Sequence, residues 1–273
     1  MLAREMICAC LVMGADYIGV FGHEKRKLAD LCNKIQSLRG VVSGGRWIRS
    51  GLMEHALIIG ASGGIGAAVA AALEGEGVNV RRVSRRDDGL EVTDPASVAR
   101  VMGAIEGEFD LIFIAIGVLS ADGGAPEKML SAITAEAMAG AMAVNAIGPA
   151  LILQHVPRLL RRQGPSVCAV LSARVGSIGD NRLGGWYSYR ASKAALNQIV
   201  HGAAIEIGRK RKEAAVVALH PGTVATPFTA DYAARHKTVS PEDAARNLIT
   251  VIKGLTPEQN GGFYDYAGRE IVW

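Results

Sequence analysis

The feature that most constrains this fold is an apolar run that leads into a glycine-rich turn and then into an alanine-rich run. Residues 56–59 are apolar and predict a strand, and residues 65–73 predict a helix. The turn between them, at residues 60–66, reads GASGGIG. A strand that turns on glycines into the start of a helix is typical of the first unit of a parallel α/β sheet.

This turn also predicts a binding site. Gly60 permits a tight turn, Gly64 lets the backbone approach a bound pyrophosphate, and Gly66 permits close packing of the helix on the strand. The first turn of the helix offers free amide N–H groups and a favourable dipole to a phosphate. We therefore expect a dinucleotide to bind here; the alternative is a turn with a purely structural role. The candidate contacts are Gly60, Ser62, Gly64, Ile65 and Gly66.

Apolar and helical runs alternate along the rest of the chain. Further strands are predicted at residues 78–83, 111–116, 167–171 and 215–219, and further helices at residues 95–105, 134–160 and 189–207. The helix at 134–160 is expected to bend near Gly148 and Pro149. The strands are continuously apolar, which indicates a sheet covered on both faces. The predicted fold class is α/β, a doubly wound parallel sheet of Rossmann type, in a single domain at residues 53–273.

Residues 1–52 differ from the rest and are interpreted as an N-terminal extension. They contain an amphipathic stripe within residues 28–38 and then a Gly/Ser/Arg-rich stretch at residues 41–51. Met53 stands just before the first predicted strand, where a dinucleotide-binding domain often begins. We hypothesise that Met53 is the natural first residue and that residues 1–52 are not native. The alternative is a genuine extension or a targeting segment.

Composition narrows the class of partner. The net charge is only +4, and no aromatic residues alternate with the short cationic clusters, which argues against nucleic acid. No apolar run reaches the roughly 18 residues that span a membrane. The four cysteines form no disulfide or zinc pattern. We therefore expect a cytoplasmic protein in a reducing compartment, without a metal site.

The end of the second predicted strand distinguishes the two nicotinamide dinucleotides. An acidic residue there usually binds the ribose 2′-hydroxyl of NAD, whereas a basic residue suits the 2′-phosphate of NADP. Ser84 occupies the position expected for the acid, and Arg85 follows it with a planar guanidinium. The sequence therefore favours NADP(H), the alternative being arginines on a solvated sheet edge. Asp87 and Asp88 are interpreted as loop residues.

A tyrosine and a lysine four residues apart offer acid–base chemistry. Tyr189 and Lys193 lie in a predicted helix, where this spacing places them on one face. The lysine ammonium would stabilise the phenolate, lower the pKa of the phenol and make it a usable proton donor near neutral pH. Together with the glycine turn, the pair suggests hydride and proton transfer to a carbonyl. Tyr187 has no lysine at this spacing and is interpreted as a wall of the pocket.

Five motifs follow one another in a recognisable order. They are GASGGIG at residues 60–66, VN at 144–145, GSI-x-DN at 176–181, YRASKAALN at 189–197 and HPGTV-x-T at 220–226. With these motifs the chain from about residue 55 onward resembles the short-chain dehydrogenase/reductase superfamily. Within that superfamily it is similar to the branch of carbonyl reductases and the C-factor signalling protein. The resemblance implies a homodimer or homotetramer that associates through the long central helix and the helix bearing Tyr189.

The resemblance also implies roles for the matching residues. Tyr189 would donate and accept the proton, and Lys193 would lower the pKa of that tyrosine and hold the nicotinamide ribose. Asn145 would support a water that links the lysine to solvent. A turn after the last predicted strand would frame the nicotinamide carboxamide. Its residues are Pro221, Gly222, Val224 and Thr226.

Two positions depart from the family pattern. The serine that orients the substrate carbonyl in the family is Ala173 here. Either Ser172 or Ser177 replaces it, or that hydrogen bond is missing; losing one such donor costs on the order of 10²–10³ in rate. The second departure is at residues 114–117, which read IAIG where the family has Asn-Asn-Ala-Gly. Those asparagines mainly brace the strand in the family, so their loss weakens the match more than the chemistry.

The sequence thus predicts an oxidoreductase that transfers hydride from NADPH to an aldehyde or ketone. Tyr189 is the expected proton donor, and Lys193, Asn145 and Ser172 are the further catalytic candidates. One alternative is a nucleotide-binding signalling or regulatory protein of C-factor type with little catalysis. Another is a structural α/β domain that binds no cofactor.

The small-molecule substrate is expected to lie between two segments, residues 176–187 and residues 227–237. Trp186, Phe228 and Tyr232 in these segments suggest an apolar or aromatic carbonyl compound.

Overall fold

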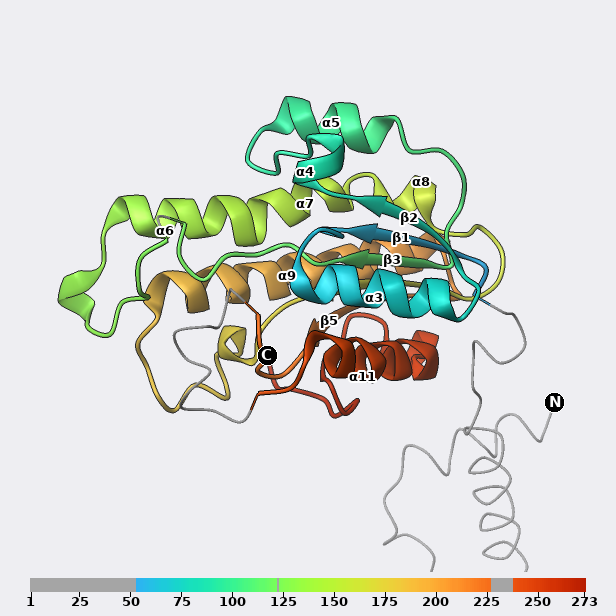
Figure 1. Ribbon diagram of the computed structural model, residues 1–273. Helices are drawn as coiled ribbons and strands as arrows, with labels where there is room; N and C mark the ends of the chain where they lie inside the picture. Colours follow the sequence, from blue (N-terminus) through green and yellow to red (C-terminus); the bar gives the residue numbers. More distant parts are fainter. Residues whose placement is uncertain (1–52, 122, 227–237) are drawn as a thin grey trace, which may run out of the picture. The chain divides into compact units, whose positions relative to one another are not determined.

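A sheet of parallel strands forms the centre of the described part of the chain. The computed structural model describes residues 53–121, 123–226 and 238–273. The strands run in the order β2-β1-β3-β4-β5-β6, and every neighbouring pair is parallel (Figure 1). This confirms the predicted doubly wound parallel sheet. The strands are β1 (His55–Ile59), β2 (Asn79–Val83), β3 (Leu111–Ile114), β4 (Ser166–Leu171), β5 (Ala214–His220) and β6 (Phe263–Asp265).

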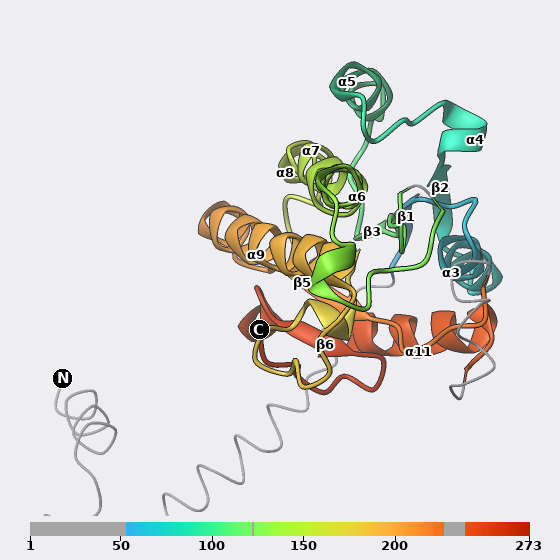
Figure 2. The ribbon, with the colours of Figure 1, turned by 90° about the vertical axis from the view of Figure 1, so that its left-hand side faces the viewer.

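Helices cover both faces of the sheet. Helices α3 and α11 lie on one face, and α5, α6, α7 and α9 lie on the other (Figure 2). The side chains of β1 alternate accordingly: Leu57 and Ile59 pack with residues of α5, α7 and α9, and Ile58 packs with residues of α3 and α11. The α-helices are α3 (Gly64–Gly75), α4 (Arg85–Asp88), α5 (Pro95–Gly103), α6 (Ala135–Met142), α7 (Gly148–Leu153), α8 (Val156–Leu159), α9 (Tyr187–Lys210) and α11 (Pro241–Gly254). Short 3-10 helices span Leu130–Ala132, Arg174–Gly176 and Pro257–Gln259.

The long helix predicted at residues 134–160 is not uniform. Helix α6 continues into a π-helical segment, Ala143–Ile147, which leads into α7, while α8 is a separate short helix. Pro149 has no amide N–H, so it cannot donate to the carbonyl of Asn145 as an α-helical ladder would require. The irregularity predicted near Gly148 and Pro149 is therefore a widened turn directly before them.

The stretch Ala135–Leu153 is long and apolar enough to cross a membrane, so the expectation that no apolar run reaches this length is wrong. In the fold α6 packs against α9, and α7 packs against α5 and α9. Ile152 and Leu153 belong to the core beneath these helices. This packing explains the apolar composition of Ala135–Leu153, because a helix in the core of a protein is as apolar as one that spans a membrane.

One helix and one strand at the C-terminal end are absent from the elements predicted from the sequence. Ser240 caps α11 by accepting a hydrogen bond from the amide of Asp243 at 3.0 Å, and Pro241 occupies the first helical position. These cap signals precede an apolar stripe and were sufficient to predict the helix. Strand β6 has only three residues, which is too short for a periodic pattern. Residues 1–52 and 227–237, including Phe228 and Tyr232, lie outside the described residues.

A buried carboxylate joins three segments at the amino end of the sheet. Asp110, which precedes β3, is 7% exposed. Its carboxylate accepts hydrogen bonds from the amides of Glu54 and His55 at 2.8 and 3.0 Å. It also pairs with the guanidinium of Arg161, at 2.5 Å. Asp110 thus ties the start of β1 to the segment that follows α8.

Replacing this carboxylate by an amide should weaken the fold. Asp110→Asn keeps the size of the side chain but removes the charge that Arg161 and two backbone amides share. We expect the free energy of unfolding to fall by about 1–3 kcal/mol. Urea titration followed by circular dichroism measures the change. An unchanged midpoint would show that the contact contributes nothing to stability.

Candidate active site

The candidate residues lie where neighbouring strands end. In a parallel sheet the carboxyl ends of the strands share one edge, which is where ligands bind in open α/β folds. The amides of Gly60 and Ala61 donate to the carbonyl of Val83 at 2.9 and 3.1 Å, so the glycine turn after β1 lies beside the end of β2. Segments far apart in the sequence therefore meet at this edge.

The glycine turn is closely packed on its inner side and open on the other. Gly60 has a φ of +89°, and a Cβ on it would overlap the carbonyl of Ala115. A Cβ on Gly66 would overlap the carbonyl of Gly60. In contrast, Ser62, Gly63 and Gly64 are exposed. Among the described residues no side chain caps α3, whose N-cap is Gly63, and its first turn carries no acidic residue.

The turn after β5 reaches this glycine turn. A Cβ on Gly64 would lie 2.8 Å from the Cγ2 of Thr226, so the two segments are neighbours. The backbone around Val224 is held by residue 239: the amide of Ala225 donates to the carbonyl of Val239 at 2.9 Å, and the amide of Val239 donates to the carbonyl of Thr223 at 3.1 Å. Pro221 and Gly222 precede this held segment, and Gly222 has a φ of +82°.

Helix α9 presents Tyr189 and Lys193 one turn apart. Both side chains are buried, at 6% and 3% exposure. The Nζ of Lys193 donates to the carbonyl of Leu171 at the end of β4, at 3.2 Å. A Cβ on Gly117 would lie 3.2 Å from that Nζ and 3.2 Å from the Oδ1 of Asn145. The lysine and the asparagine therefore converge on Gly117, where a side chain would fit only if one of them moved slightly.

Asn145 lies in the π-helical segment and bonds in two directions. Its Oδ1 accepts from the amide of Val118 at 2.7 Å, and its Nδ2 donates to the carbonyl of Val118 at 2.9 Å. The same Nδ2 donates to the hydroxyl of Ser192 at 3.0 Å, and that hydroxyl donates to the carbonyl of Tyr189 at 2.8 Å. One buried amide thus connects the segment after β3 to the first turns of α9. A π-helical turn of this kind is frequent at functional sites.

Burial changes the acidity of both titratable groups. It lowers the pKa of Lys193 from 10.5 to about 8, because the charged ammonium is removed from water. It raises the pKa of the Tyr189 phenol well above its ordinary value of 10.0 for the same reason. The sequence predicts a pKa lowered by Lys193. That prediction is wrong in direction for this structure, in which burial is the cause of the shift.

The two serines proposed to replace the missing family serine both have other partners. The hydroxyl of Ser172 donates to the Oδ1 of Asn197 at 2.6 Å, and both residues are buried. The hydroxyl of Ser177 donates to the carbonyl of Val272 and accepts from the amide of Asp180 at 3.0 Å. Ser172 therefore remains a candidate beside Lys193 and Ala173, with its proton directed at α9, whereas Ser177 binds the C-terminal segment.

The end of β2 presents a basic residue next to an acidic pair. Asp87 and Asp88 lie in α4, a single helical turn, so the prediction of a loop there is wrong. Their carboxylates fold back on Ser84: its hydroxyl donates to Asp87 and its amide donates to Asp88, both at 2.8 Å. The Arg85 side chain is 81% exposed and lies 3.9 Å from the carboxylate of Glu91. Arg85 therefore remains accessible to a ligand, although acidic groups are close by.

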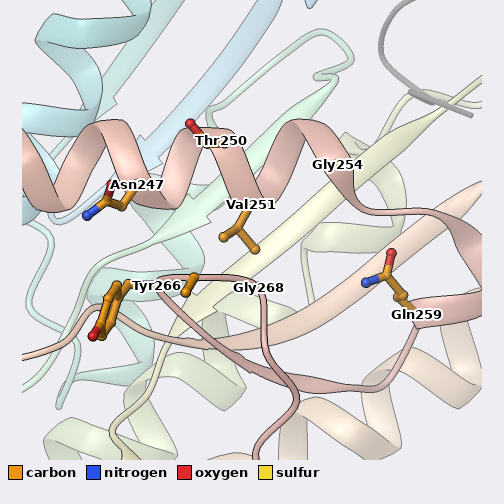
Figure 3. Close-up of a pocket in the computed structure, with 8 residues that line it drawn as sticks. Asn247, Thr250, Val251, Gly254, Gln259, Tyr266 and Gly268 are labelled. Atoms are coloured by element: carbon orange, nitrogen blue, oxygen red, sulfur yellow. The ribbon is translucent and has the colours of Figure 1, made fainter. Parts of the chain in front are cut away.

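A separate hollow of about 400 Å³ lies beside α11 and the turn that follows β6 (Figure 3). Val251 points from α11 toward this turn, and Tyr266 lies at its edge. The lining residues are Asn247, Thr250, Val251, Gly254, Gln259, Tyr266, Ala267 and Gly268. None of them belongs to the candidate site. Within the described ranges, no group of three or more His, Cys, Asp or Glu side chains could hold a metal ion.

Comparison with known proteins identifies the family. A family model described as enoyl-(acyl carrier protein) reductase matches residues 89–261. The 1-hydroxy-2-glutathionyl-2-methyl-3-butene dehydrogenase of Rhodococcus sp. (strain AD45) is 31% identical over 236 residues, which cover 81% of this chain and 100% of that protein. The chain belongs to the short-chain dehydrogenase/reductase superfamily. The resemblance found in the sequence motifs is thereby confirmed.

Two further proteins are similar to this chain. The C-signal of Myxococcus xanthus is 38% identical over 137 residues, which cover 50% of this chain and 78% of that protein. The solved structure of NADPH-bound carbonyl reductase from chicken fatty liver shares the short-chain reductase fold, with a TM-score of 0.67 and 23% identity. The match between the two structures covers 84% of this chain and 98% of the carbonyl reductase chain. The superfamily membership makes the chain an oxidoreductase by class.

The buried Lys193 predicts a specific dependence of stability on pH. Because its pKa is about 8 when folded and 10.5 in its ordinary state, the unfolded chain binds this proton more tightly. Burial of the charged lysine therefore lowers the stability of the folded protein. This loss is fully present below pH 8 and disappears as the pH rises from 8 toward 10.5. At pH 7 the free energy of unfolding of Lys193→Met should therefore exceed that of the wild type by up to about 3 kcal/mol. This difference should shrink above pH 8.

Thermal unfolding of both proteins between pH 7 and pH 10 measures this difference. An advantage that stays constant, or grows with pH, would contradict the burial of a charged Lys193. Asp110→Asn serves as the control, because its stability difference from the wild type should not change across this pH range.

Proposed function

We propose that this protein is an NADPH-dependent carbonyl reductase that acts on a small aldehyde or ketone, with Tyr189 as the proton donor. The observation that carries the proposal is the convergence of Lys193 and Asn145 on Gly117, one helical turn from Tyr189. This group lies at the carboxyl edge of the sheet, which also carries the glycine turn. The arrangement supplies an acid and a cation beside a place where a dinucleotide fits.

The residues of the glycine turn fit a nicotinamide dinucleotide. The exposed stretch at residues 62–64 leads into the first turn of α3, which has no side-chain cap. The first amide N–H groups of a helix have no acceptor within it, so they would bind a pyrophosphate here. Gly60, Ser62, Gly64, Ile65 and Gly66 would hold the pyrophosphate. Pro221, Gly222, Val224 and Thr226 would hold the nicotinamide end. A bound NADPH would supply the hydride for the carbonyl carbon.

The residues of α9 would handle the proton. The high pKa of Tyr189 keeps the phenol protonated at neutral pH, which is the state that a proton donor to a carbonyl oxygen requires. Lys193, with its pKa of about 8, stays mostly protonated there and would bind the nicotinamide ribose and return a proton to Tyr189. Asn145 fixes Ser192 and thereby the main chain at Tyr189. Ser172 is the remaining candidate for a contact to the substrate carbonyl.

Arg85 supports the choice of NADP(H) over NAD(H). Its exposed guanidinium follows directly after Ser84, at the end of the strand next to the glycine turn. A guanidinium can bind a 2′-phosphate through two parallel hydrogen bonds. Arg86 in the same turn is also exposed, but its guanidinium pairs with Asp87 at 2.9 Å, whereas Arg85 lies 3.9 Å from the carboxylate of Glu91. Arg85 is therefore the less engaged of the two and the better candidate for the phosphate.

We further propose that the protein is cytoplasmic and forms a homodimer or homotetramer through α6–α7 and α9. Ile147 and Ile205 support this assembly, because they are large apolar side chains about half exposed on these helices. Sedimentation of the purified protein would measure the oligomeric state.

A second candidate function is a nucleotide-binding signalling or regulatory protein with little catalysis. Ala173, which removes one expected hydroxyl, favours it, as does the similarity to the C-signal. An assay of NADPH oxidation over a panel of aldehydes, ketones and quinones separates the two functions. Turnover of any member would favour the reductase, and NADPH binding without turnover would favour the regulator.

Tyr189→Phe should abolish most turnover without preventing NADPH binding. The substitution removes only the proton donor, and general acid catalysis of this type contributes roughly 10²–10⁴-fold. The rate of NADPH oxidation and the fluorescence of bound NADPH measure the two effects. Tyr264→Phe is the matched control, because it removes a buried phenol whose hydroxyl donates to the carbonyl of Gln259 at 3.5 Å, and it should keep turnover within about twofold. Full activity of Tyr189→Phe would rule out the mechanism.

Arg85→Ala should weaken the use of NADPH selectively. Loss of a charged hydrogen bond to the 2′-phosphate should lower kcat/KM for NADPH by about tenfold or more and leave the value for NADH nearly unchanged. Arg86→Ala is the control, since that neighbouring guanidinium already binds Asp87 at 2.9 Å. Equal losses with both cofactors, or equal losses in both variants, would exclude Arg85 as the phosphate ligand.

A further inference from the structure

A carboxyl group from a distant segment binds the first turn of α9. Glu127 lies between β3 and α6, is 9% exposed, and precedes Ser188 by 61 residues. Its Oε2 accepts from the amide of Ser188 at 3.2 Å, and its Oε1 accepts from the hydroxyl of the same serine. Ser188 is itself buried and adjoins Tyr189.

Helix α9 needs this contact because its own N-cap provides none. The first amides of a helix have no partner within it, and an N-cap side chain of Ser, Thr, Asp or Asn usually supplies one. The N-cap of α9 is Trp186, which makes no side-chain cap bond. Glu127 therefore supplies the acceptor that the local sequence lacks, at the positive end of the helix dipole.

Glu127 also holds the backbone on which Trp186 depends. Its main-chain carbonyl accepts from the amide of Trp186 at 2.5 Å. Trp186 has a φ of 53°, the only positive value for a non-glycine residue in the described ranges, and Gly184 and Gly185 before it also have positive φ. The indole packs edge-on to the ring of Tyr189, with 6.2 Å between ring centroids. The left-handed backbone conformation is unfavourable for a tryptophan, and it persists here because the surrounding contacts hold it.

We propose that Glu127 is a positioning residue for Tyr189, an inference that rests on the proposed reductase function. Tyr189 is the third residue of α9, within the turn that frays most readily in an uncapped helix. Glu127 holds that turn by its hydrogen bonds to Ser188 and fixes Trp186, whose ring packs on that of Tyr189. The phenol of Tyr189 is thereby kept in one orientation. A displacement of about 1 Å at such a group can reduce the rate by about 10²-fold.

Three variants and one control test the role of Glu127. Glu127→Ala removes the acceptors, Ser188→Ala removes only one donor and should fold in any case, and Glu127→Gln restores an acceptor for the amide and a donor for the hydroxyl. Asp110→Asn is the matched control, since it alters a carboxylate of similar burial that accepts two backbone amides at the opposite end of the sheet. The measurements are kcat, KM, the Kd for NADPH and hydrogen–deuterium exchange of residues 187–191.

For Glu127→Ala we expect kcat to fall about tenfold or more, the Kd for NADPH to stay within about twofold, and exchange at residues 187–191 to accelerate. Ser188→Ala should show the same changes with smaller size, and Glu127→Gln should recover most of the rate. Asp110→Asn should lose stability but keep its kcat.

Three results would overturn the proposal. They are an unchanged kcat in folded Glu127→Ala and Ser188→Ala, an unchanged exchange rate at residues 187–191, and an equal loss of kcat in Asp110→Asn. If the wild-type protein reduces no carbonyl compound, the reductase function fails separately, and the exchange measurement still decides whether Glu127 holds the first turn of α9.

Discussion

The site depends on the hydrogen bonds of one buried amide, that of Asn145. This side chain binds both main-chain groups of Val118 and the hydroxyl of Ser192, which in turn binds the carbonyl of Tyr189. The segment after β3, the π-helical turn and the start of α9 are thereby fixed to each other. A buried polar group left without partners would destabilise the fold, so these hydrogen bonds favour this one arrangement. Its geometry sets where Lys193 and Tyr189 lie.

Burial gives the two titratable groups of α9 complementary states. The phenol of Tyr189 keeps its proton at neutral pH because its pKa is raised, and the ammonium of Lys193 has a pKa of about 8 because its charge is poorly solvated. A lysine buried in this way lowers the stability of the folded protein near neutral pH. Lys193 lies at the edge of the sheet where ligands bind in this fold. A destabilising charged group at such a place is typical of binding or catalytic sites.

Much of this arrangement was predictable from the sequence, because local patterns specify local structure. The strand, glycine turn and helix at residues 56–73 and the alternation of apolar and helical runs predicted the parallel sheet, which the structure confirms. The spacing of Tyr189 and Lys193 placed both on one face of α9. The cap at Ser240 and Pro241 was also visible, and overlooking it left α11 out of the prediction.

What could not be predicted depends on contacts between distant segments. Nothing local shows that Glu127 caps a helix that begins 60 residues later, or that Ser177 binds the C-terminal segment. The pKa of Tyr189 was predicted in the wrong direction because spacing reveals the neighbouring charge but not the depth of burial.

A crystal structure of the protein with NADP(H) bound tests the central claim most directly. Our account predicts the pyrophosphate on residues 60–66 and the Tyr189 hydroxyl facing the nicotinamide, with room for a carbonyl oxygen at about 3 Å. A Tyr189 hydroxyl turned into the protein interior, or a cofactor bound elsewhere, would contradict it.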